Sequence, residues 1–369
     1  MKKKYSLLPL ACLFYPLYLV VLAHNLDDGL ALPANQVSTM AGSGITGFAN
    51  GKGKKAQFSL PTGIAIDVKG NLYVADFDNH RIRKVSSDGV VTTIAGNGNA
   101  GLVDGKGGQA QFNHPVAIAI DKKGNVYVAD QGNHCIRKIS PVGVVETLAG
   151  NGIPGFAEGA GAQAQFYSPT GLTVDKKGNV IVADRDNHRI RQISPLGVVS
   201  TLAGLGIPGF AEGPCMSSLF NAPNGVAVDS SGNLFVVEFI GQRIRKISLD
   251  GMVTTFAGNG KGGYADGLAE EAEFSRPTGV TIDTKGNVYV ADAGNCCIRI
   301  ITPTGVVSTV AGTGAANFKD NEGLLAQFNF PSELAVSPTG TLYVADANNH
   351  RIRRIEQVKQ MSKLKYPLD

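Results

Sequence analysis

Histidine is the residue whose repetition in this 369-residue chain most directly suggests chemistry. Asn-His pairs recur, at multiples of 54 residues, as Asn79-His80, Asn133-His134, Asn187-His188 and Asn349-His350. Imidazole is a common metal ligand and a proton donor or acceptor near neutral pH. A side chain needed in most copies of a repeat serves the repeat itself, however, and symmetry-related copies lie too far apart to share one ion. We therefore expect these histidines to be structural.

A site confined to one place is expected where the repeats disagree. Glu333 stands where four other copies have glycine, and Glu238 ends a Val-Val-Glu string that replaces Val-Ala-Asp. One carboxylate with polar partners can hold a divalent metal that activates water. The candidate catalytic residues are Glu333, Glu238, Asn224, His114 and Arg276, and Glu333 is the candidate metal ligand. Ordinary drift among the repeats is the alternative that we favour.

Two further repeated positions have expected structural roles. Asp76 and its equivalents are expected to accept hydrogen bonds from backbone N–H groups of the following turn, in which Asn79 tolerates the tight conformation. A second acidic position, each time followed within nine residues by a Phe, carries Asp104, Glu158, Glu212, Asp266 and Asp320. We expect a short helical turn there, capped by the acid and pinned by the Phe. The dense alternating carboxylates of calcium loops are missing.

The cysteines give no clear framework. Cys296 and Cys297 are adjacent, so they form either a strained vicinal disulfide or two thiols. The sequence contains no Cys-x-x-Cys pair and no nucleophile elbow, His-Glu-x-x-His string, phosphate loop or dinucleotide fingerprint. No cofactor is predicted, and a divalent metal such as Ca or Mg belongs only to the enzymatic alternative.

The elements that must position these residues are short strands in a strict repeat. Six copies follow one another without a gap, as marked by Asp76, Asp130, Asp184, Glu238, Asp292 and Asp346 at intervals of 54. Each copy contains four apolar runs separated by turns with Gly or Asn, which predicts a four-stranded antiparallel meander. One meander cannot bury both faces, whereas six around an axis can. The fold class is therefore all-β, a six-bladed β-propeller of four-stranded antiparallel blades.

The two ends of the repeat array complement each other. The segment 37–42 matches the fourth run of the next copy, 91–96, but no first three runs precede it. The last copy ends after its third run, at 352–355. We therefore expect the N-terminal strand to form the outer edge of the last blade, which closes the ring and leaves no mismatched edge. The propeller is expected to span residues 36–356.

The repeated string Asn-x-Tyr-Val-Ala-Asp-x-x-Asn-His-Arg-Ile-Arg-Lys-Ile resembles the NHL repeat, and the resemblance covers all six copies. It implies a six-bladed NHL propeller of the kind found in bacterial exported proteins. Similar repeats also occur in kinase sensor domains, RNA-binding regulators and an amidating lyase, so the resemblance is specific for fold rather than for function. The copies here are longer than the usual repeat, because long loops such as 97–112 join one copy to the next. These loops should share a face with the Asn-His-Arg turns, and that face is the candidate binding surface.

The N-terminus has the pattern of an export signal. Three lysines precede the uncharged, largely apolar segment 5–23. We expect residues 1–23 to be a signal peptide, with an uncleaved N-terminal anchor as the alternative, followed by a linker at 24–35; residues 357–369 form a basic tail. Cleavage would lower the formal net charge from +4 to +1, which gives no reason to bind nucleic acid.

These features together predict a secreted, periplasmic or cell-envelope protein that works as a monomeric binding scaffold. Its partner would be a protein or a small ligand on the loop face, and it would contact a membrane only if the N-terminal segment is uncleaved. A metal-assisted hydrolase or lyase, lactonase-like and with its site at the mouth of the channel, is the alternative function.

Overall fold

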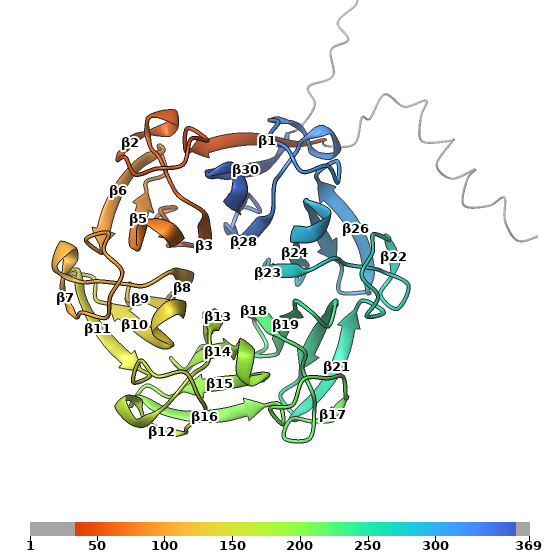
Figure 1. Ribbon diagram of the computed structural model, residues 1–369. Helices are drawn as coiled ribbons and strands as arrows, with labels where there is room; N and C mark the ends of the chain where they lie inside the picture. Colours follow the sequence, from red (N-terminus) through yellow and green to blue (C-terminus); the bar gives the residue numbers. More distant parts are fainter. Residues whose placement is uncertain (1–33, 359–369) are drawn as a thin grey trace, which may run out of the picture. The chain divides into compact units, whose positions relative to one another are not determined.

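The computed structural model describes residues 34–358, whose strands form six antiparallel sheets arranged radially around a central axis (Figure 1). The all-β six-bladed propeller is therefore confirmed. The signal peptide or anchor expected at 1–23, most of the expected linker and the tail from 359 lie outside the described residues. Within 34–358 the helical elements are single 3-10 turns, and none is long or apolar enough to cross a bilayer.

Each blade runs from an inner strand beside the axis to an outer strand at the rim (Figure 1). From the inside outward, blades one to three contain β3 Pro61–Ile66, β4 Leu72–Asp76, β5 Arg81–Val85 and β6 Val90–Ala95; β8 Pro115–Ile120, β9 Val126–Asp130, β10 Cys135–Ile139 and β11 Val144–Ala149; and β13 Pro169–Val174, β14 Val180–Asp184, β15 Arg189–Ile193 and β16 Val198–Ala203. Blades four to six contain β18 Pro223–Val228, β19 Leu234–Glu238, β20 Arg243–Ile247 and β21 Met252–Ala257; β23 Pro277–Ile282, β24 Val288–Asp292, β25 Cys297–Ile301 and β26 Val306–Ala311; and β28 Pro331–Val336, β29 Leu342–Asp346, β30 Arg351–Val358 and β1 Ala34–Ala41.

Every sheet has five strands, so the prediction of four is wrong. The long loop ahead of each blade adds a two-residue strand to the outer edge of that blade. These strands are β2 Gly51–Lys52, β7 Gly105–Lys106, β12 Gly159–Ala160, β17 Gly213–Pro214, β22 Gly267–Leu268 and β27 Asn321–Glu322. The backbone of each loop thereby covers hydrogen-bonding groups that a four-stranded blade would expose at its edge.

The ring closes in blade six, where strands from the two ends of the chain share one sheet. The strand order there is β27, β1, β30, β29, β28. Strand β1 takes the place of the fourth strand that the last repeat lacks. It does not form the outer edge as predicted, because β27 lies outside it and pairs Asn321 with Val37 and Glu322 with Gln36.

A buried ion pair organises every blade, as blade two shows. The fully buried guanidinium of Arg137 donates to Asp130 Oδ2 at 2.8 Å and to Asp104 Oδ1 at 2.7 Å. Asp130 also accepts from the backbone N–H of Asn113 at 2.7 Å and from the Asn133 amide at 2.8 Å. Burial raises the pKa of Asp130 to about 6, so this carboxylate is still ionised at neutral pH. The six arginines are Arg83, Arg137, Arg191, Arg245, Arg299 and Arg353.

This network corrects two expected roles. In blade one, the backbone donor to Asp76 is Ser59, which precedes the first strand, rather than a residue of the following turn. The second acidic position accepts a hydrogen bond from a neighbouring strand, as Asp104 does from Thr147 N–H at 3.1 Å, and it caps no helical turn. Where this residue is aspartate it also contacts the buried arginine, as Asp104, Asp266 and Asp320 do, whereas Glu158 and Glu212 bind only the strand. The Phe of this segment is fully buried and packs between two blades, as Phe112 does between blades one and two. These residues are Phe58, Phe112, Phe166, Phe220, Phe274 and Phe328.

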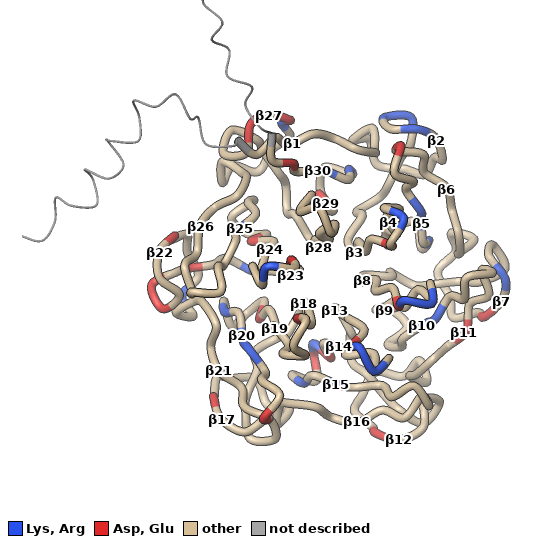
Figure 2. Tube along the Cα trace, turned by 180° about the vertical axis from the view of Figure 1, so that it is seen from behind, with Lys and Arg blue, Asp and Glu red and all other residues tan. Residues whose placement is uncertain are grey.

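The propeller has two different faces. The loop face carries the long loops and the turns between second and third strands, which are joined by hydrogen bonds such as Asn79 Nδ2 to Gly47 O at 2.8 Å. The predicted sharing of a face by these elements is confirmed. The turn face carries the turns between first and second strands and those between third and fourth strands. The two kinds of turn lie side by side within a blade. In blade two, for example, a Cβ added to Gly124 of the first turn would lie 3.7 Å from Cγ of Pro141 in the second turn. Figure 2 views the propeller from this side.

Candidate functional site

The central channel is lined by the six inner strands β3, β8, β13, β18, β23 and β28. Its side chains are Ile, Leu, Val and Ala, with hydroxyls from Thr173 and Thr281 and a single carboxylate from Glu333. The cavity has a volume of about 220 Å³. A channel of this size can hold several waters or one small organic molecule.

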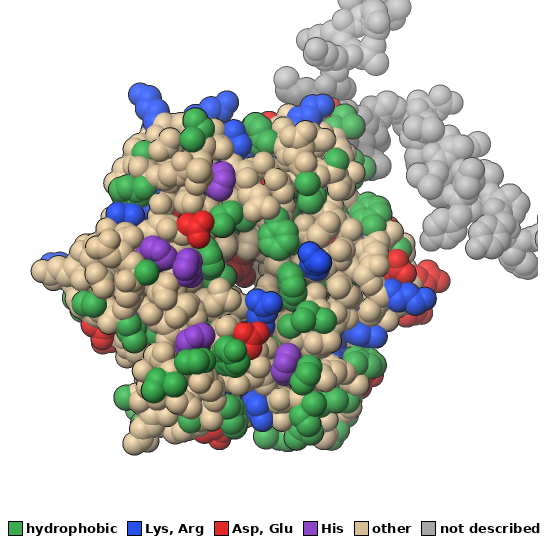
Figure 3. Space-filling model, viewed as in Figure 1, with side chains coloured by type: hydrophobic (Ala, Val, Ile, Leu, Met, Phe, Trp, Pro, Cys, Tyr) green, Lys and Arg blue, Asp and Glu red, His purple; other side chains and the backbone are tan. Residues whose placement is uncertain are grey.

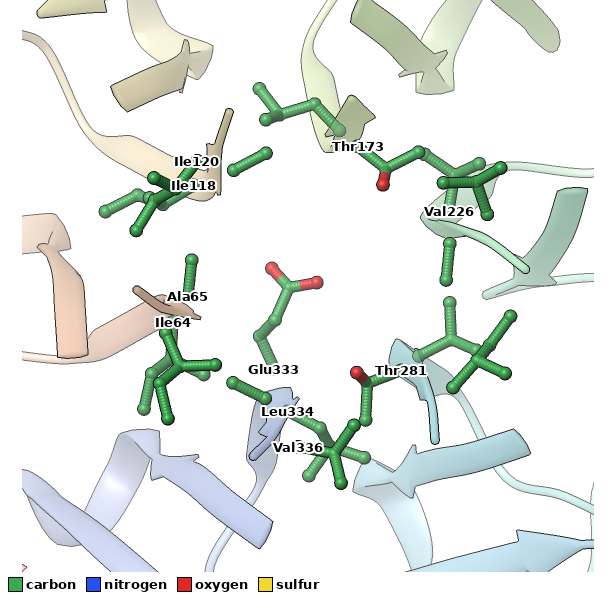
Figure 4. A pocket seen from close by; sticks show the side chains of 18 of the residues that line it. Ile64, Ala65, Ile118, Ile120, Thr173, Val226, Thr281, Glu333, Leu334 and Val336 are labelled. Carbon is green, nitrogen blue, oxygen red and sulfur yellow. The ribbon is translucent and has the colours of Figure 1, made fainter. Parts of the chain in front are cut away.

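Glu333 is the one charged residue of this lining, and its carboxylate points toward the middle of the channel (Figure 4). Blades one, three, four and five have glycine at the same position because the inner strand of the next blade passes close by. A Cβ on Gly279 would lie 2.5 Å from Ser332 O. The side chain of Glu333 instead extends into the open channel. Burial away from bulk water, with no hydrogen-bond donor among the described residues, raises its pKa to about 8.

Glu238 belongs to the blade-four copy of the buried ion pair. Its carboxylate accepts from Asn221 N–H at 2.7 Å and lies 3.3 Å from Arg245 Nη1. The residue is buried and every contact repeats one made by aspartate in the other blades. Glu238 is therefore a structural residue, and its sequence difference is a conservative exchange within the repeat.

The other three candidates lie around the channel but do not converge on Glu333. Asn224, on β18, donates to Thr278 O of the next blade at 3.3 Å. His114 packs against the rings of Phe77 and His80 on the loop face, with Nε2 3.8 Å from a carboxylate oxygen of Asp78. Arg276 is exposed, and its backbone N–H donates to Gln242 Oε1 at 2.7 Å. Within residues 34–358 no three His, Cys, Asp or Glu side chains are grouped as metal ligands.

Each of the four repeated histidines links its blade to the next, a role that sequence reasoning missed. Nδ1 of His80 accepts a hydrogen bond from the backbone N–H of His114, 34 residues later, at 3.1 Å. The same bond joins His134 to Ser168, His188 to Ala222 and His350 to Leu60, at 3.1 to 3.2 Å. Burial lowers the pKa of all four histidines, which keeps Nδ1 free to accept. The sequence signal was present: Gln242, another acceptor, stands at this position in blade four.

The loops ahead of blades three and four present apolar side chains on the loop face. Ile153 and Ile207 are 58% and 57% exposed, and Phe156 and Phe210 three residues later are also exposed. Each Phe lies over an arginine of the third strand, with 3.9 Å from Cζ of Arg189 to the Phe156 ring centroid. Figure 3 shows hydrophobic side chains among the polar ones on this face. The arginine stacks fix the loops, while the isoleucines project into solvent.

The described cysteines are all thiols. Cys135 and Cys297 are fully buried at equivalent positions of β10 and β25, where burial raises the pKa of both. Cys296 occupies the left-handed turn position, with φ of 49°, that histidine holds in other blades. Cys296 and Cys297 are not joined in the structure, and the choice between a vicinal disulfide and two thiols stays a prediction.

Comparison with known proteins gives matches of several kinds. A family model described as "NHL repeat" matches residues 58–85, 112–139, 166–193, 274–301 and 328–355. The bovine NHL repeat-containing protein 2 is 32% identical over 341 residues, which cover 80% of this chain and 46% of that protein. The chain spans less than half the length of the curated relatives it matches.

Solved structures share the fold at lower identity. An auxiliary nutrient binding protein from Bacteroides thetaiotaomicron has a TM-score of 0.67 at 16% identity, with 88% of this chain and 76% of that chain covered. A gluconolactonase from Xanthomonas campestris has a TM-score of 0.59 at 14% identity, with 90% and 93% covered. The same ring thus carries both binding and catalysis in other proteins.

Proposed function

The chain is an NHL-repeat protein, and from this premise we propose that its propeller is a rigid scaffold that holds a protein or a small ligand on the loop face. The exposed apolar side chains of the loops ahead of blades three and four carry the proposal. The scaffold works outside the cytoplasm, in keeping with the export signal expected at residues 1–23.

The rigidity of these loops favours binding because little conformational freedom remains to be lost. Asn187 Nδ2 donates to Gly155 O at 2.8 Å, and Arg189 donates to Leu205 O at 2.9 Å. Both donors belong to blade three, which therefore holds the loop ahead of it and the loop that follows it. Ile153 and Ile207 occupy the same position in consecutive loops, so they present a repeated apolar contact to a partner.

Site-specific photocrosslinking in cells tests this proposal. A photoreactive amino acid at Ile207 is expected to give a discrete adduct, and Ile153→Ser is expected to weaken it. The matched control places the same amino acid at Leu324, a similarly exposed residue of the loop ahead of blade six. Adducts of equal pattern and yield from both positions would contradict a specific surface.

A second candidate function is metal-assisted hydrolysis or elimination at the channel, and the central position of Glu333 favours it. In the described channel lining, a Ca²⁺ or Mg²⁺ ion would have Glu333 as its acidic ligand and hydroxyls of Thr173 and Thr281 as the other side-chain oxygens. Calcium titration of the full chain by calorimetry, compared with Glu333→Gln, tests this candidate. Saturable binding that Glu333→Gln abolishes would support it, and equal heats from both proteins would remove it.

A further inference from the structure

Lysines gather on the turn face of blades one to three, on the side of the ring shown in Figure 2. Two grooves run between neighbouring blades there, with volumes of about 420 and 690 Å³. Their lining contains seven lysines, namely Lys69, Lys84, Lys122, Lys123, Lys138, Lys176 and Lys177. It also contains four aspartates, namely Asp67, Asp121, Asp175 and Asp229. The grooves therefore have a positive excess.

Each of these aspartates accepts hydrogen bonds from residues of its own turn. Asp121, for example, accepts from Lys123 N–H at 2.9 Å and from both nitrogens of Asn125 at 2.8 and 2.7 Å. These hydrogen bonds hold the Asp121 carboxylate against the backbone. Burial alone would raise the pKa of Asp121, but the hydrogen bonds outweigh burial and the pKa lies below its usual value. The lysines at the turn tips, by contrast, are exposed. An approaching surface meets ammonium groups first.

The turn face also carries the four most exposed large apolar residues of the described chain. They are Val68, Leu196, Leu249 and Val142, at 95%, 91%, 74% and 72%. Each stands at a turn tip in blades one to four. Val68, Val142 and Leu196 lie in the blades that carry the lysines, whereas Leu249 lies beside Asp250 and the Ser230-Ser231 turn. Apolar tips surrounded by basic residues are the composition with which peripheral proteins enter the headgroup region of a bilayer.

The chain enters and leaves the propeller at turns of this face. Asn35 and Glu356 stand in blade six at the repeat positions of Gly89 and Ser86, which form the turn between third and fourth strands in blade one. In the sequence, the uncharged segment 5–23 precedes Asn35, and the lysines Lys359, Lys363 and Lys365 follow Glu356.

From these observations we propose that the turn face docks on an anionic lipid membrane. The lysines contact lipid phosphates, and the apolar tips of blades one to three enter the interface. The loop face then points away from the membrane, open to a partner. The docking does not rest on the proposed function of the loop face. Unlike the membrane contact expected from the sequence, it does not require residues 1–23 to be uncleaved.

Tryptophan fluorescence tests the docking directly, since the chain contains no Trp. Leu196→Trp in the full chain is expected to shift its emission to the blue, and to be quenched by lipid-borne bromine, on phosphatidylglycerol vesicles. The matched control Ile45→Trp, on an exposed tip of the loop face, is expected to give no change. An unchanged emission from Trp at 196, or an equal shift from Trp at 45, would overturn the proposal.

Charge removal separates docking from anchoring by the N-terminal segment, because both of the variants compared keep residues 1–23 and any lipid preference that Lys2, Lys3 and Lys4 add. The combined variant Lys122→Ser, Lys123→Ser, Lys176→Ser and Lys177→Ser copies the natural Ser230-Ser231 turn of blade four, so it should fold. A lysine near an anionic surface changes partitioning about fivefold. The variant should lose more than about a hundredfold of its preference for phosphatidylglycerol over phosphatidylcholine.

The control removes the same charge from the long loops, by Lys54→Ser, Lys106→Ser, Lys261→Ser and Lys319→Ser, and should keep that preference within about threefold. Equal losses from both variants would overturn the proposal. So would a wild-type chain that prefers a soluble polyanion such as heparin to vesicles, because the surface would then serve a polymer rather than a membrane.

Discussion

The hydrogen bond from Ala222 N–H to His188 Nδ1 gives a sharp test of how the blades are held together. The bond is 3.2 Å long, and Ala222 is 2% exposed, so its N–H has no access to water when the acceptor is lost. His188→Ala removes the acceptor and leaves this buried donor unpaired. A net cost of about 1–3 kcal/mol is expected. For a propeller of this size that corresponds to a fall in Tm of about 2–4 °C.

Blade four supplies the matched control. Gln242 accepts the equivalent bond, from Arg276 N–H at 2.7 Å, with nearly the same left-handed backbone. His188→Gln is therefore expected to cost less than about 0.5 kcal/mol in urea denaturation at pH 7.5.

The pH dependence of the same pair of variants adds a second readout. Burial is the largest cause that lowers the pKa of His188 in the folded protein. The unfolded chain, with an ordinary pKa near 6.5, therefore binds the proton more readily. The stability from neutral His188 is complete above about pH 6.5 and is lost as pH falls through the folded pKa. Because glutamine does not titrate, the free energy of unfolding of His188→Gln should fall less than that of wild type as the pH is lowered. The reasoning is refuted if Gln and Ala destabilise equally at pH 7.5, or if Ala costs nothing.

Three further outcomes follow from the buried groups. Arg245→Leu should cost about 3–5 kcal/mol in chemical denaturation, because it leaves the Glu238 carboxylate buried and unpaired, and loss below 1 kcal/mol would contradict the ion pair. Glu333→Gln should match the free energy of unfolding of wild type at pH 5 but exceed it by about 1–2 kcal/mol at pH 9, because a carboxyl pKa raised to about 8 costs stability as pH rises from about 4.5. Partial exposure of Glu333 to the open channel reduces the effect, and a difference that shrinks with rising pH would count against it. Among the described cysteines of the native protein, the half-buried Cys215 should react first with a thiol reagent, while Cys135 and Cys297 react only on unfolding; equal rates for the three would contradict their burial.

The fold was predictable to a large extent because a strict repeat multiplies weak local signals. One strand pattern such as Leu72–Asp76 is ambiguous alone, but six copies in register predict a closed ring. The fifth strand could not be predicted, since β2 consists only of Gly51 and Lys52. Two residues carry no periodicity, and they pair as a strand only because Val90 and Val91 of the finished blade lie beside them.

The candidate site was predicted only in part. Glu333 was found because it breaks the glycine pattern, and the structure places it in the channel as its singular position suggested. Glu238 broke the pattern too, yet the structure places it in the buried ion pair with Arg245 that every blade has. A departure from the repeat says that a side chain differs. Whether the change creates a site depends on whether that side chain faces a cavity or a partner.

The sequence by itself determined the blade number, the all-β class and the meeting of the chain ends in blade six, because the 54-residue period and its two complementary gaps are properties of order along the chain. Tertiary structure alone decided which groups meet across blades. The bond between His188 and Ala222, the orientation of Glu333 into the channel and the gathering of Lys122, Lys177 and Leu196 on one face all join residues of different turns or repeats. Such meetings depend on the closed ring, which brings short local patterns to common faces that no single repeat contains.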